Sequence, residues 1–211
     1  MSTEKIRIAV LVSGGGTNLQ AILDAVDSGI ITHGEVKAVI SSRADAYALE
    51  RAKKHGVDGK VVSRKDCESQ KAFEKGITDI LDEYKIDLIV LAGFMSILSA
   101  DFTKKYENRI LNVHPSLIPS FCGKGFYGLR VHEAALSYGV KVTGATVHFV
   151  NEIPDGGEII LQKAVYIEPG DTPETLQKRV MREAEWKILP EAVSLFCQGR
   201  IKINGNKTEI I

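Results

Sequence analysis

Residues 6–12 read IRIAVLV, and residues 13–18, which follow them, read SGGGTN. The first run is short, almost entirely apolar and rich in β-branched side chains, which is typical of a buried strand in a parallel sheet. After the glycines, Leu19, Ile22 and Leu23 recur at helical spacing. A strand, a tight turn and a helix in this order are the first unit of an α/β fold.

Strand-like and helix-like segments continue to alternate through the first half of the chain. Strands are expected at residues 36–40, 61–62 and 87–92, and helices at residues 45–55 and 68–84. Crossovers of this length between strands produce a parallel sheet with helices on both faces. The first half of the chain therefore predicts a parallel sheet.

The second half of the chain changes character. Its expected elements are strands at residues 109–113, 143–150 and 158–165, helices at residues 131–138 and 172–196, and a hairpin at residues 201–211 that turns at Asn204-Gly205. A short polar connection joins the strands at 143–150 and 158–165, which favours antiparallel pairing. We predict one α/β domain, with a mostly parallel sheet flanked by helices and a late antiparallel extension.

Charge is balanced, with 27 Lys and Arg against 27 Asp and Glu. A net charge of zero does not favour a nucleic-acid or membrane surface, and no apolar run approaches the roughly 18 residues of a membrane helix. Cys67, Cys122 and Cys197 lie far apart and in no metal-ligand spacing, which predicts free thiols in the cytoplasm and no metal site. Small molecules are therefore the expected partners, and the sequence leaves the oligomeric state open.

The glycine-rich turn is the first candidate binding site. Glycines let the backbone approach a ligand closely, and free N–H groups at the start of a helix attract phosphate. Thr17 and Asn18 can add side-chain donors. The turn lacks the Lys-Ser/Thr ending of a nucleotide P-loop and the third glycine of a dinucleotide fingerprint. A simple tight turn with a capping threonine is the alternative.

Asn112 and His114 are the second candidate site, two residues apart near the end of an expected buried strand. Their side chains share one face of that strand. A neutral histidine can move a proton near pH 7, and an amide can donate a hydrogen bond to a developing oxyanion. The alternative is a structural core histidine beside an asparagine that caps the loop.

Asp155 precedes two glycines in the segment NEIPDGG at residues 151–157. Such a segment is typical of a turn between strands, in which the aspartate caps its own backbone. Alternatively, the carboxylate reaches His114, orients the ring and favours its protonated form. The local sequence favours the structural role.

Three motifs resemble those of the phosphoribosylglycinamide formyltransferases, folate-dependent enzymes of purine synthesis: NVHPSLIP at residues 112–119, SGGGTNL at residues 13–19 and DGG at residues 155–157. The similarity extends over nearly the whole chain, including LAGFMSIL at residues 91–98 and TVHFV at residues 146–150. It implies a single Rossmann-like formyltransferase domain over residues 1–211. The N-terminal half would bind phosphate, and the C-terminal half would bind folate and carry out catalysis.

The resemblance also implies the roles of individual residues. The catalytic trio implied is Asn112, His114 and Asp155. The residues implied to bind the acceptor are Gly16, Thr17 and Asn18 at its phosphate and Glu185 at its ribose. The residues implied to bind folate are Gln70, Met95, Ser96, Ile97, Leu98 and Asn112. Ser96 and Gln70 stand where many relatives carry arginine, and Trp186-Lys187 stands in place of a His-Pro pair.

The implied reaction moves the formyl group of 10-formyltetrahydrofolate, a co-substrate, to the amine of 5′-phosphoribosylglycinamide in de novo purine biosynthesis. The amine attacks directly through a tetrahedral intermediate, without a metal. Asn112 and a protonated His114 are expected to stabilise the oxyanion, with Asp155 raising the pKa of His114. The alternatives are another 10-formyltetrahydrofolate enzyme, such as a hydrolase or a transferase for a different amine, or a noncatalytic domain that binds a phosphate ligand.

Overall fold

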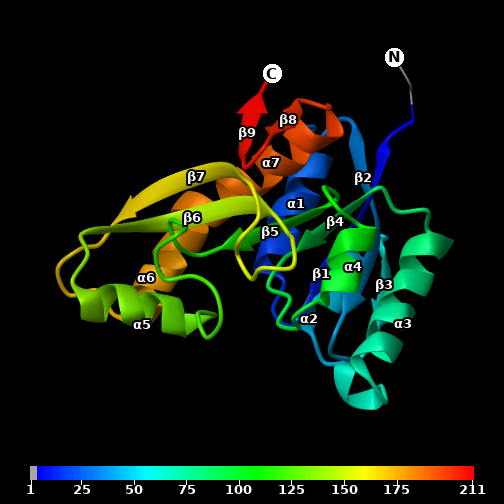
Figure 1. Cartoon of the computed structure of the whole chain (residues 1–211), viewed down its shortest axis with the longest axis horizontal. Helices are drawn as coiled ribbons and strands as arrows, with labels where there is room; N and C mark the ends of the chain where they lie inside the picture. Colours follow the sequence, from blue (N-terminus) through cyan, green and yellow to red (C-terminus); the bar gives the residue numbers. More distant parts are fainter. Residues whose placement is uncertain (1–3) are drawn as a thin grey trace.

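β1 (Ile6–Val12) lies inside a seven-stranded sheet, between β2 (Gly34–Ser41) and β4 (Leu88–Leu91) (Figure 1). The computed structural model describes residues 4–211. Successive side chains of β1 enter two different hydrophobic cores: Val10 lies in one core, and Leu11 lies in the other. Both faces of the strand are buried, which explains the continuous apolar run in its sequence.

The sheet is parallel in its first part and antiparallel in its last. Its other strands are β3 (Asp58–Val61), β5 (Ile110–His114), β6 (Val142–Phe149) and β7 (Ile159–Tyr166). The strand order is β3-β2-β1-β4-β5-β6-β7, with antiparallel pairing only at β5–β6 and β6–β7. A separate hairpin consists of β8 (Ile201–Asn204) and β9 (Lys207–Ile210). The predicted fold class and the late antiparallel extension are confirmed.

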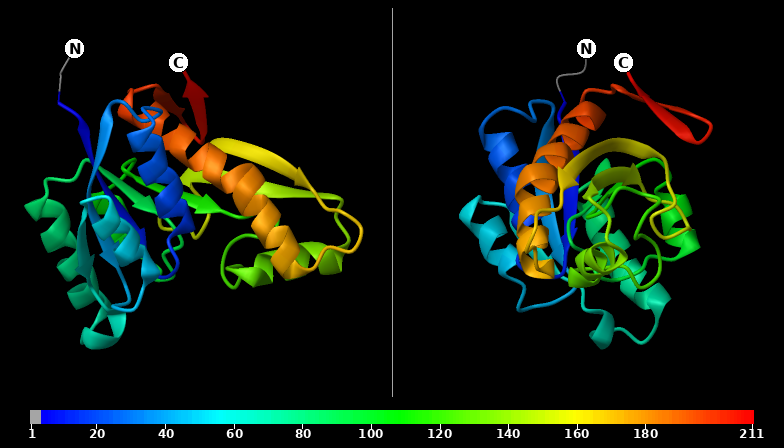
Figure 2. Two further views of the ribbon diagram at one scale, coloured as in Figure 1. Left: turned by 180° about the vertical axis from the view of Figure 1, so that it is seen from behind. Right: turned by 90° about the vertical axis from the view of Figure 1, so that its left-hand side faces the viewer.

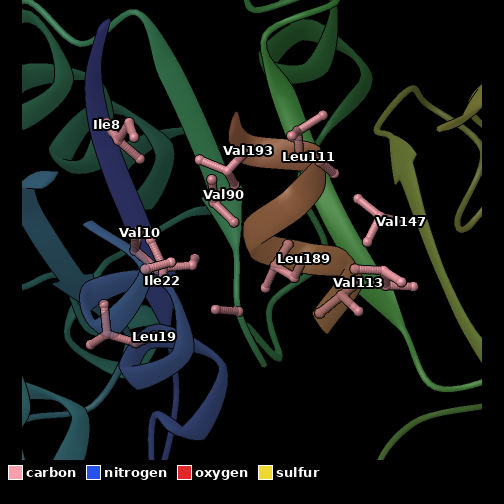
Figure 3. Packing of buried hydrophobic residues seen from close by; sticks show 14 of the residues in the cluster. Ile8, Val10, Leu19, Ile22, Val90, Leu111, Val113, Val147, Leu189 and Val193 are labelled. Carbon is pink, nitrogen blue, oxygen red and sulfur yellow. The ribbon is translucent and has the colours of Figure 1, made fainter. Parts of the chain in front are cut away.

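Helices cover both faces of the sheet (Figure 2). They are α1 (Thr17–Asp27), α2 (Tyr47–Lys54), α3 (Gln70–Glu83), α4 (Ala100–Lys105), α5 (Leu129–Tyr138), α6 (Pro173–Val180) and α7 (Trp186–Cys197). α1 and α7 belong to one core, in which Leu189 and Val193 of α7 pack near Val90 and Leu111 of the sheet (Figure 3). α3 and α4 supply Phe73 and Phe102 to the core on the opposite face.

Two strands differ from the expectation. β3 comprises Asp58–Val61 instead of residues 61–62, because it is a largely exposed edge strand that pairs only with β2 and needs no apolar run. β5 continues through His114, which pairs with Thr146 of β6, so Pro115 ends the strand one residue later than predicted. The hairpin turn is also shifted, since Asn204 pairs with Lys207 and leaves residues 205–206 as the turn.

Two helical features were not predicted. α4 is only six residues long and is capped by Ser99, whose Oγ accepts a hydrogen bond from the backbone N–H of Phe102. The expected single helix at residues 172–196 is interrupted by a π-helical turn, η2 (Met181–Glu185). Such turns place one extra residue in the helix and often occur at functional sites.

Replacing Leu189 with alanine tests whether the α7 face holds the molecule together. Leu189 is completely buried, so we expect Leu189→Ala to lower the free energy of unfolding by about 2–5 kcal/mol. Glu191→Ala, at an exposed position of the same helix, is the matched control and should change it by less than about 0.5 kcal/mol. Urea unfolding of both variants measures the difference, and equal effects would contradict this packing.

Candidate active site

The last residues of β5 carry two polar side chains next to β6. Asn112 pairs with His148 of β6, and His114 pairs with Thr146. His114 is only 5% exposed, so its ring lies almost entirely inside the protein. The two side chains lie on one face of the strand, as predicted from their spacing.

The turn that carries Asp155 has a steric reason for its two glycines. A Cβ at Gly157 would collide with the backbone oxygen of Phe149, and one at Gly156 would lie 2.6 Å from the side chain of Ile153. Asp155 itself has a φ of 57°, in the left-handed region that non-glycine residues seldom adopt. Such backbone strain persists where the surroundings hold the residue in place.

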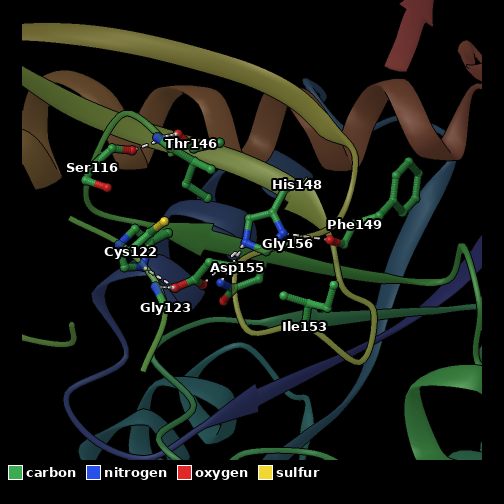
Figure 4. A network of polar contacts seen from close by, with 12 residues as sticks. Ser116, Cys122, Gly123, Thr146, His148, Phe149, Ile153, Asp155 and Gly156 are labelled. Carbon is green, nitrogen blue, oxygen red and sulfur yellow. Dashed lines mark hydrogen bonds and ion pairs between the residues drawn. The ribbon is translucent and has the colours of Figure 1, made fainter. Parts of the chain in front are cut away.

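The turn brings Asp155 to His114. Asp155 Oδ2 lies 3.5 Å from His114 Nδ1 and accepts a hydrogen bond of 2.7 Å from the backbone N–H of Gly123. His114 Nε2 lies 2.9 Å from the carbonyl oxygen of Phe121. Both ring nitrogens of His114 therefore face acceptors, and the loop at residues 120–128 (the 120s loop) contacts both members of the pair. Figure 4 shows Gly123 of this loop beside Asp155.

Burial decides the charge of His114. It lowers the pKa of the ring, and the nearby carboxylate of Asp155 opposes this effect without overcoming it. The effect of Asp155 has the expected direction, but the expectation of a net raised pKa and a protonated ring is wrong. For Asp155, burial raises the pKa, but hydrogen bonds that favour the carboxylate, such as the one from the backbone N–H of Gly123, and the nearness of the two histidine rings outweigh it, so the pKa lies below its ordinary value. The resting site holds a neutral ring beside a carboxylate.

His148 belongs to the same cluster, although it was not among the predicted site residues. Its Nε2 lies 3.1 Å from Asn112 Nδ2 and 3.7 Å from Asp155 Oδ1. His132 is also buried, and burial lowers its pKa to about 4. Neither ring nitrogen of His132 has a hydrogen-bond partner among residues 4–211. Only the register of β5 with β6 shows that His148 lies opposite Asn112, and the amino-acid sequence does not contain a signal for that register.

The glycine-rich turn leaves the start of α1 open. Gly16 is the N-cap residue, with a φ of 71°, and no side chain caps the first turn. The alternative role of Thr17 as the capping residue is therefore wrong, because Thr17 is already inside the helix. A Cβ at Gly16 would lie 2.6 Å from Cβ of Ala48, so only glycine fits here. Open backbone N–H groups at a helix start suit an anion.

Asn18 and Glu185 meet in the interior, although they are far apart in the sequence. Asn18 Nδ2 donates a hydrogen bond of 2.6 Å to Glu185 Oε2, and Glu185 ends the π-helical turn η2. Burial raises the pKa of Glu185 to about 7, and the bond from Asn18 opposes the shift. Asn18 Oδ1 is buried and has no hydrogen-bond partner within the described residues 4–211. The structure thus joins a predicted phosphate-site residue to the predicted ribose-site residue.

A cavity of about 130 Å³ adjoins the polar cluster. It is lined in part by Ser96, Ile97 and Leu98 together with Asn112, His148 and Asp155. Met95 is exposed and does not line it; its backbone N–H donates to Ser13 Oγ at 2.9 Å. This bond ties the segment after β4 to the glycine-rich turn.

Gln70 supports the same segment from α3. Its Nε2 donates to the carbonyl oxygen of Ile97 at 3.0 Å and to Glu74 Oε1 at 2.6 Å. Glu74 in turn accepts hydrogen bonds of 2.6 Å from the backbone and the hydroxyl of Ser99. Gln70 therefore contacts the backbone of the predicted folate segment and does not line the cavity.

A larger hollow, of about 940 Å³, lies along α1 and α7, where Thr17, Arg51 and Trp186 are among its lining residues. It contains none of the polar cluster of β5 and β6. Within residues 4–211, no group of three His, Cys, Asp or Glu side chains is arranged to hold a metal ion. In that same part of the chain, no helix has the length and apolar character needed to cross a membrane.

Comparison with known sequences gives consistent matches. Residues 6–193 match the sequence model of the formyl transferase family. The chain is 44% identical over 200 residues to phosphoribosylglycinamide formyltransferase of Haemophilus influenzae, covering 95% of this chain and 91% of that protein. It is 44% identical over 204 residues to trifunctional purine biosynthetic protein adenosine-3 of Bos taurus, covering 96% of this chain. The chain spans only 19% of that longer relative.

Comparison with solved structures agrees. The crystal structure of glycinamide ribonucleotide transformylase 1 from Symbiobacterium toebii is similar, with a TM-score of 0.93 and 47% sequence identity. The similarity covers 100% of this chain and 96% of that one. At this coverage, the likeness includes both the parallel part of the sheet and its antiparallel extension.

The buried Glu185 makes stability depend on pH. Its folded pKa of about 7 lies above the ordinary 4.5, so the stability from the neutral form is fully present below pH 4.5 and is lost as pH rises through about 7. The loss is at most about 3 kcal/mol. Glutamine cannot ionise. As pH rises from 5 to 8, we therefore expect the free energy of unfolding of Glu185→Gln to increase relative to that of the natural chain. Urea unfolding at both pH values measures this; a constant difference would rule out the shift.

Proposed function

The chain belongs to the formyl transferase family, and we propose that it transfers the formyl group of 10-formyltetrahydrofolate to the amine of 5′-phosphoribosylglycinamide in purine biosynthesis. The observation that carries this proposal is the cluster of Asn112, His114 and Asp155 beside the cavity that Ser96, Ile97 and Leu98 help to line. The matched relatives named for this reaction support the choice of substrates. The reaction needs no metal.

The acceptor binds through its phosphate at Gly16, Thr17 and Asn18, where the start of α1 presents uncapped backbone N–H groups. Glu185 contacts the ribose, next to Asn18. Holding the acceptor at both points directs its amine toward the folate and makes the attack effectively intramolecular. The pairing of Asn18 with Glu185 supports this arrangement.

The folate binds along the segment after β4, with Met95, Ser96, Ile97 and Leu98 beside its pterin and Gln70 bracing Ile97. This places the formyl carbon next to Asn112. When the amine attacks, negative charge grows on the formyl oxygen, and an N–H of Asn112 donates a hydrogen bond to it. Asn112 thus serves both the folate site and the reaction.

His114 accepts the proton that the attacking amine loses. Its lowered pKa keeps the ring neutral and able to act as a base at pH 7. Asp155, 3.5 Å from Nδ1, stabilises the imidazolium that forms, and the proton then passes to N10 of the departing folate. Phe121 O occupies Nε2 in this structure, so the 120s loop must move away before Nε2 can contact substrate.

We further propose that residues 1–211 act as one formyltransferase domain. The hydrogen bond from the backbone N–H of Met95 to Ser13 Oγ supports this proposal. It fixes the proposed phosphate site at the start of α1 relative to the proposed folate site after β4. Three free cysteines within the described part of the chain support a reducing compartment such as the cytoplasm.

A formyl-transfer assay tests the reaction. Purified protein is mixed with 10-formyltetrahydrofolate, with or without glycinamide ribonucleotide, and release of tetrahydrofolate is measured. Release that depends on the ribonucleotide is the expected result. Release without any acceptor would overturn the proposal in favour of a hydrolase, and no release under either condition would overturn it in favour of another acceptor or a noncatalytic phosphate-binding domain.

Replacing Asp155 tests the acid–base assignment. Asp155→Asn should lower kcat by roughly two to four powers of ten, the range of general acid–base contributions.

In the natural chain, kcat/KM should fall as pH drops through the lowered pKa of His114, below the ordinary 6.5. Asp155 raises the pKa of His114, so in Asp155→Asn this fall of kcat/KM at acid pH (the acid limb of the profile) should shift to lower pH. His33→Asn, at an exposed histidine outside the site, should leave rate and profile unchanged; an unshifted limb in Asp155→Asn would refute the assignment.

A further inference from the structure

His148 is buried in the middle of the polar cluster without an assigned role. Only 1% of its surface is exposed, and it stands directly opposite Asn112 in the antiparallel register of β5 and β6. On its other side, the register of β6 with β7 shifts at this point: Val147 pairs with Leu161, and His148 pairs with Ile159. The fold therefore fixes the ring of His148 beside the amide of Asn112.

The tautomer of His148 follows from its other contact. Its Nδ1 lies 2.6 Å from the carbonyl oxygen of Phe149, and a carbonyl oxygen only accepts hydrogen bonds. Nδ1 must therefore carry a proton and donate it. In the neutral ring, Nε2 is then left with a lone pair and can only accept.

The acceptor at Nε2 determines how Asn112 is turned. Nε2 lies 3.1 Å from Asn112 Nδ2, closer than the 3.7 Å to Asp155 Oδ1. The amide must present its NH2 group to this lone pair. Among residues 4–211, this is the only side-chain hydrogen bond of Asn112. One of its two N–H donors is thus used by His148, and the other remains available to the cavity that both residues line.

We propose that His148 is a positioning residue, which orients the Asn112 amide so that its free N–H, and not its carbonyl oxygen, faces the reacting formyl group. An amide flipped by 180° would present Oδ1 to the developing oxyanion and repel it. His148 acts without touching substrate, through Nε2. This inference rests on the proposed function of Asn112.

Two substitutions of His148 distinguish the effect of the Nε2 acceptor on the rate from the effect of the ring's volume. His148→Phe keeps most of the volume and removes the lone pair, and should lower kcat by about 10²-fold, as when an oxyanion donor is lost. The KM for the ribonucleotide should change less than about threefold, since its phosphate and ribose contacts do not involve Asn112. His148→Gln places a carbonyl oxygen near the former Nε2 and should recover most of the rate. No recovery in His148→Gln, or a loss confined to KM, would overturn the inference.

A double-mutant cycle shows whether His148 acts through Asn112. The rate of the double variant Asn112→Ala with His148→Phe should match that of Asn112→Ala alone within about threefold, because the second change has nothing left to orient. Losses that multiply would mean an independent role for His148. If the natural chain transfers formyl groups and the losses multiply, only this inference fails; absence of transfer in the natural chain instead refutes the proposed function.

The tautomer can be measured without activity. Nuclear magnetic resonance of the protein labelled with ¹⁵N-histidine, at a pH where the His148 ring is neutral, should show the ring proton on Nδ1. This experiment uses the natural chain, so it holds even if His148→Phe fails to fold. A proton on Nε2 in the neutral ring would contradict the proposed orientation of Asn112.

Discussion

The antiparallel register of β5 and β6 is the constraint on which the reactive part of this molecule depends. It sets Asn112 opposite His148 and His114 opposite Thr146; His148, His114 and Thr146 are buried, and Asn112 is half-buried. Polar groups buried without partners are costly, which favours hydrogen bonds to these side chains from nearby elements. The contacts come from Asp155 and Phe121 to His114, and from Gly123 to Asp155. They explain why the turn at residues 151–157 and the 120s loop both pack against the end of β5.

The two ends of the proposed site, at the start of α1 and after β4, are held at fixed positions by hydrogen bonds between distant parts of the sequence. Ser13 Oγ accepts from the backbone of Met95, and Asn18 donates to Glu185 across 167 residues. Glu74 fixes the segment after β4 from the opposite face of the sheet through Ser99. A reaction between two bound molecules needs such rigidity, because catalysis by orientation is lost when the two sites move relative to each other.

The parts that could be predicted from sequence are those encoded by local pattern. The apolar run of β1 and the spacing of Asn112 and His114 gave the sheet and a shared polar face, and motif resemblance supplied a reason for Asp155 to approach them. The role of His148 could not be predicted, because alternation in a strand identifies its faces but not which residue lies opposite across the sheet. The net pKa of His114 also depends on burial, and burial emerges only when all elements pack. β3, an exposed edge strand, left no apolar pattern to find.

The most direct test is a crystal structure with glycinamide ribonucleotide and a folate analogue whose formyl group cannot transfer. The proposed mechanism predicts the phosphate at residues 16–18, the carbonyl oxygen of the analogue within hydrogen-bond distance of Asn112 Nδ2, and the amine beside His114. A folate bound instead in the hollow along α1 and α7, with the cluster of β5 and β6 untouched, would contradict it.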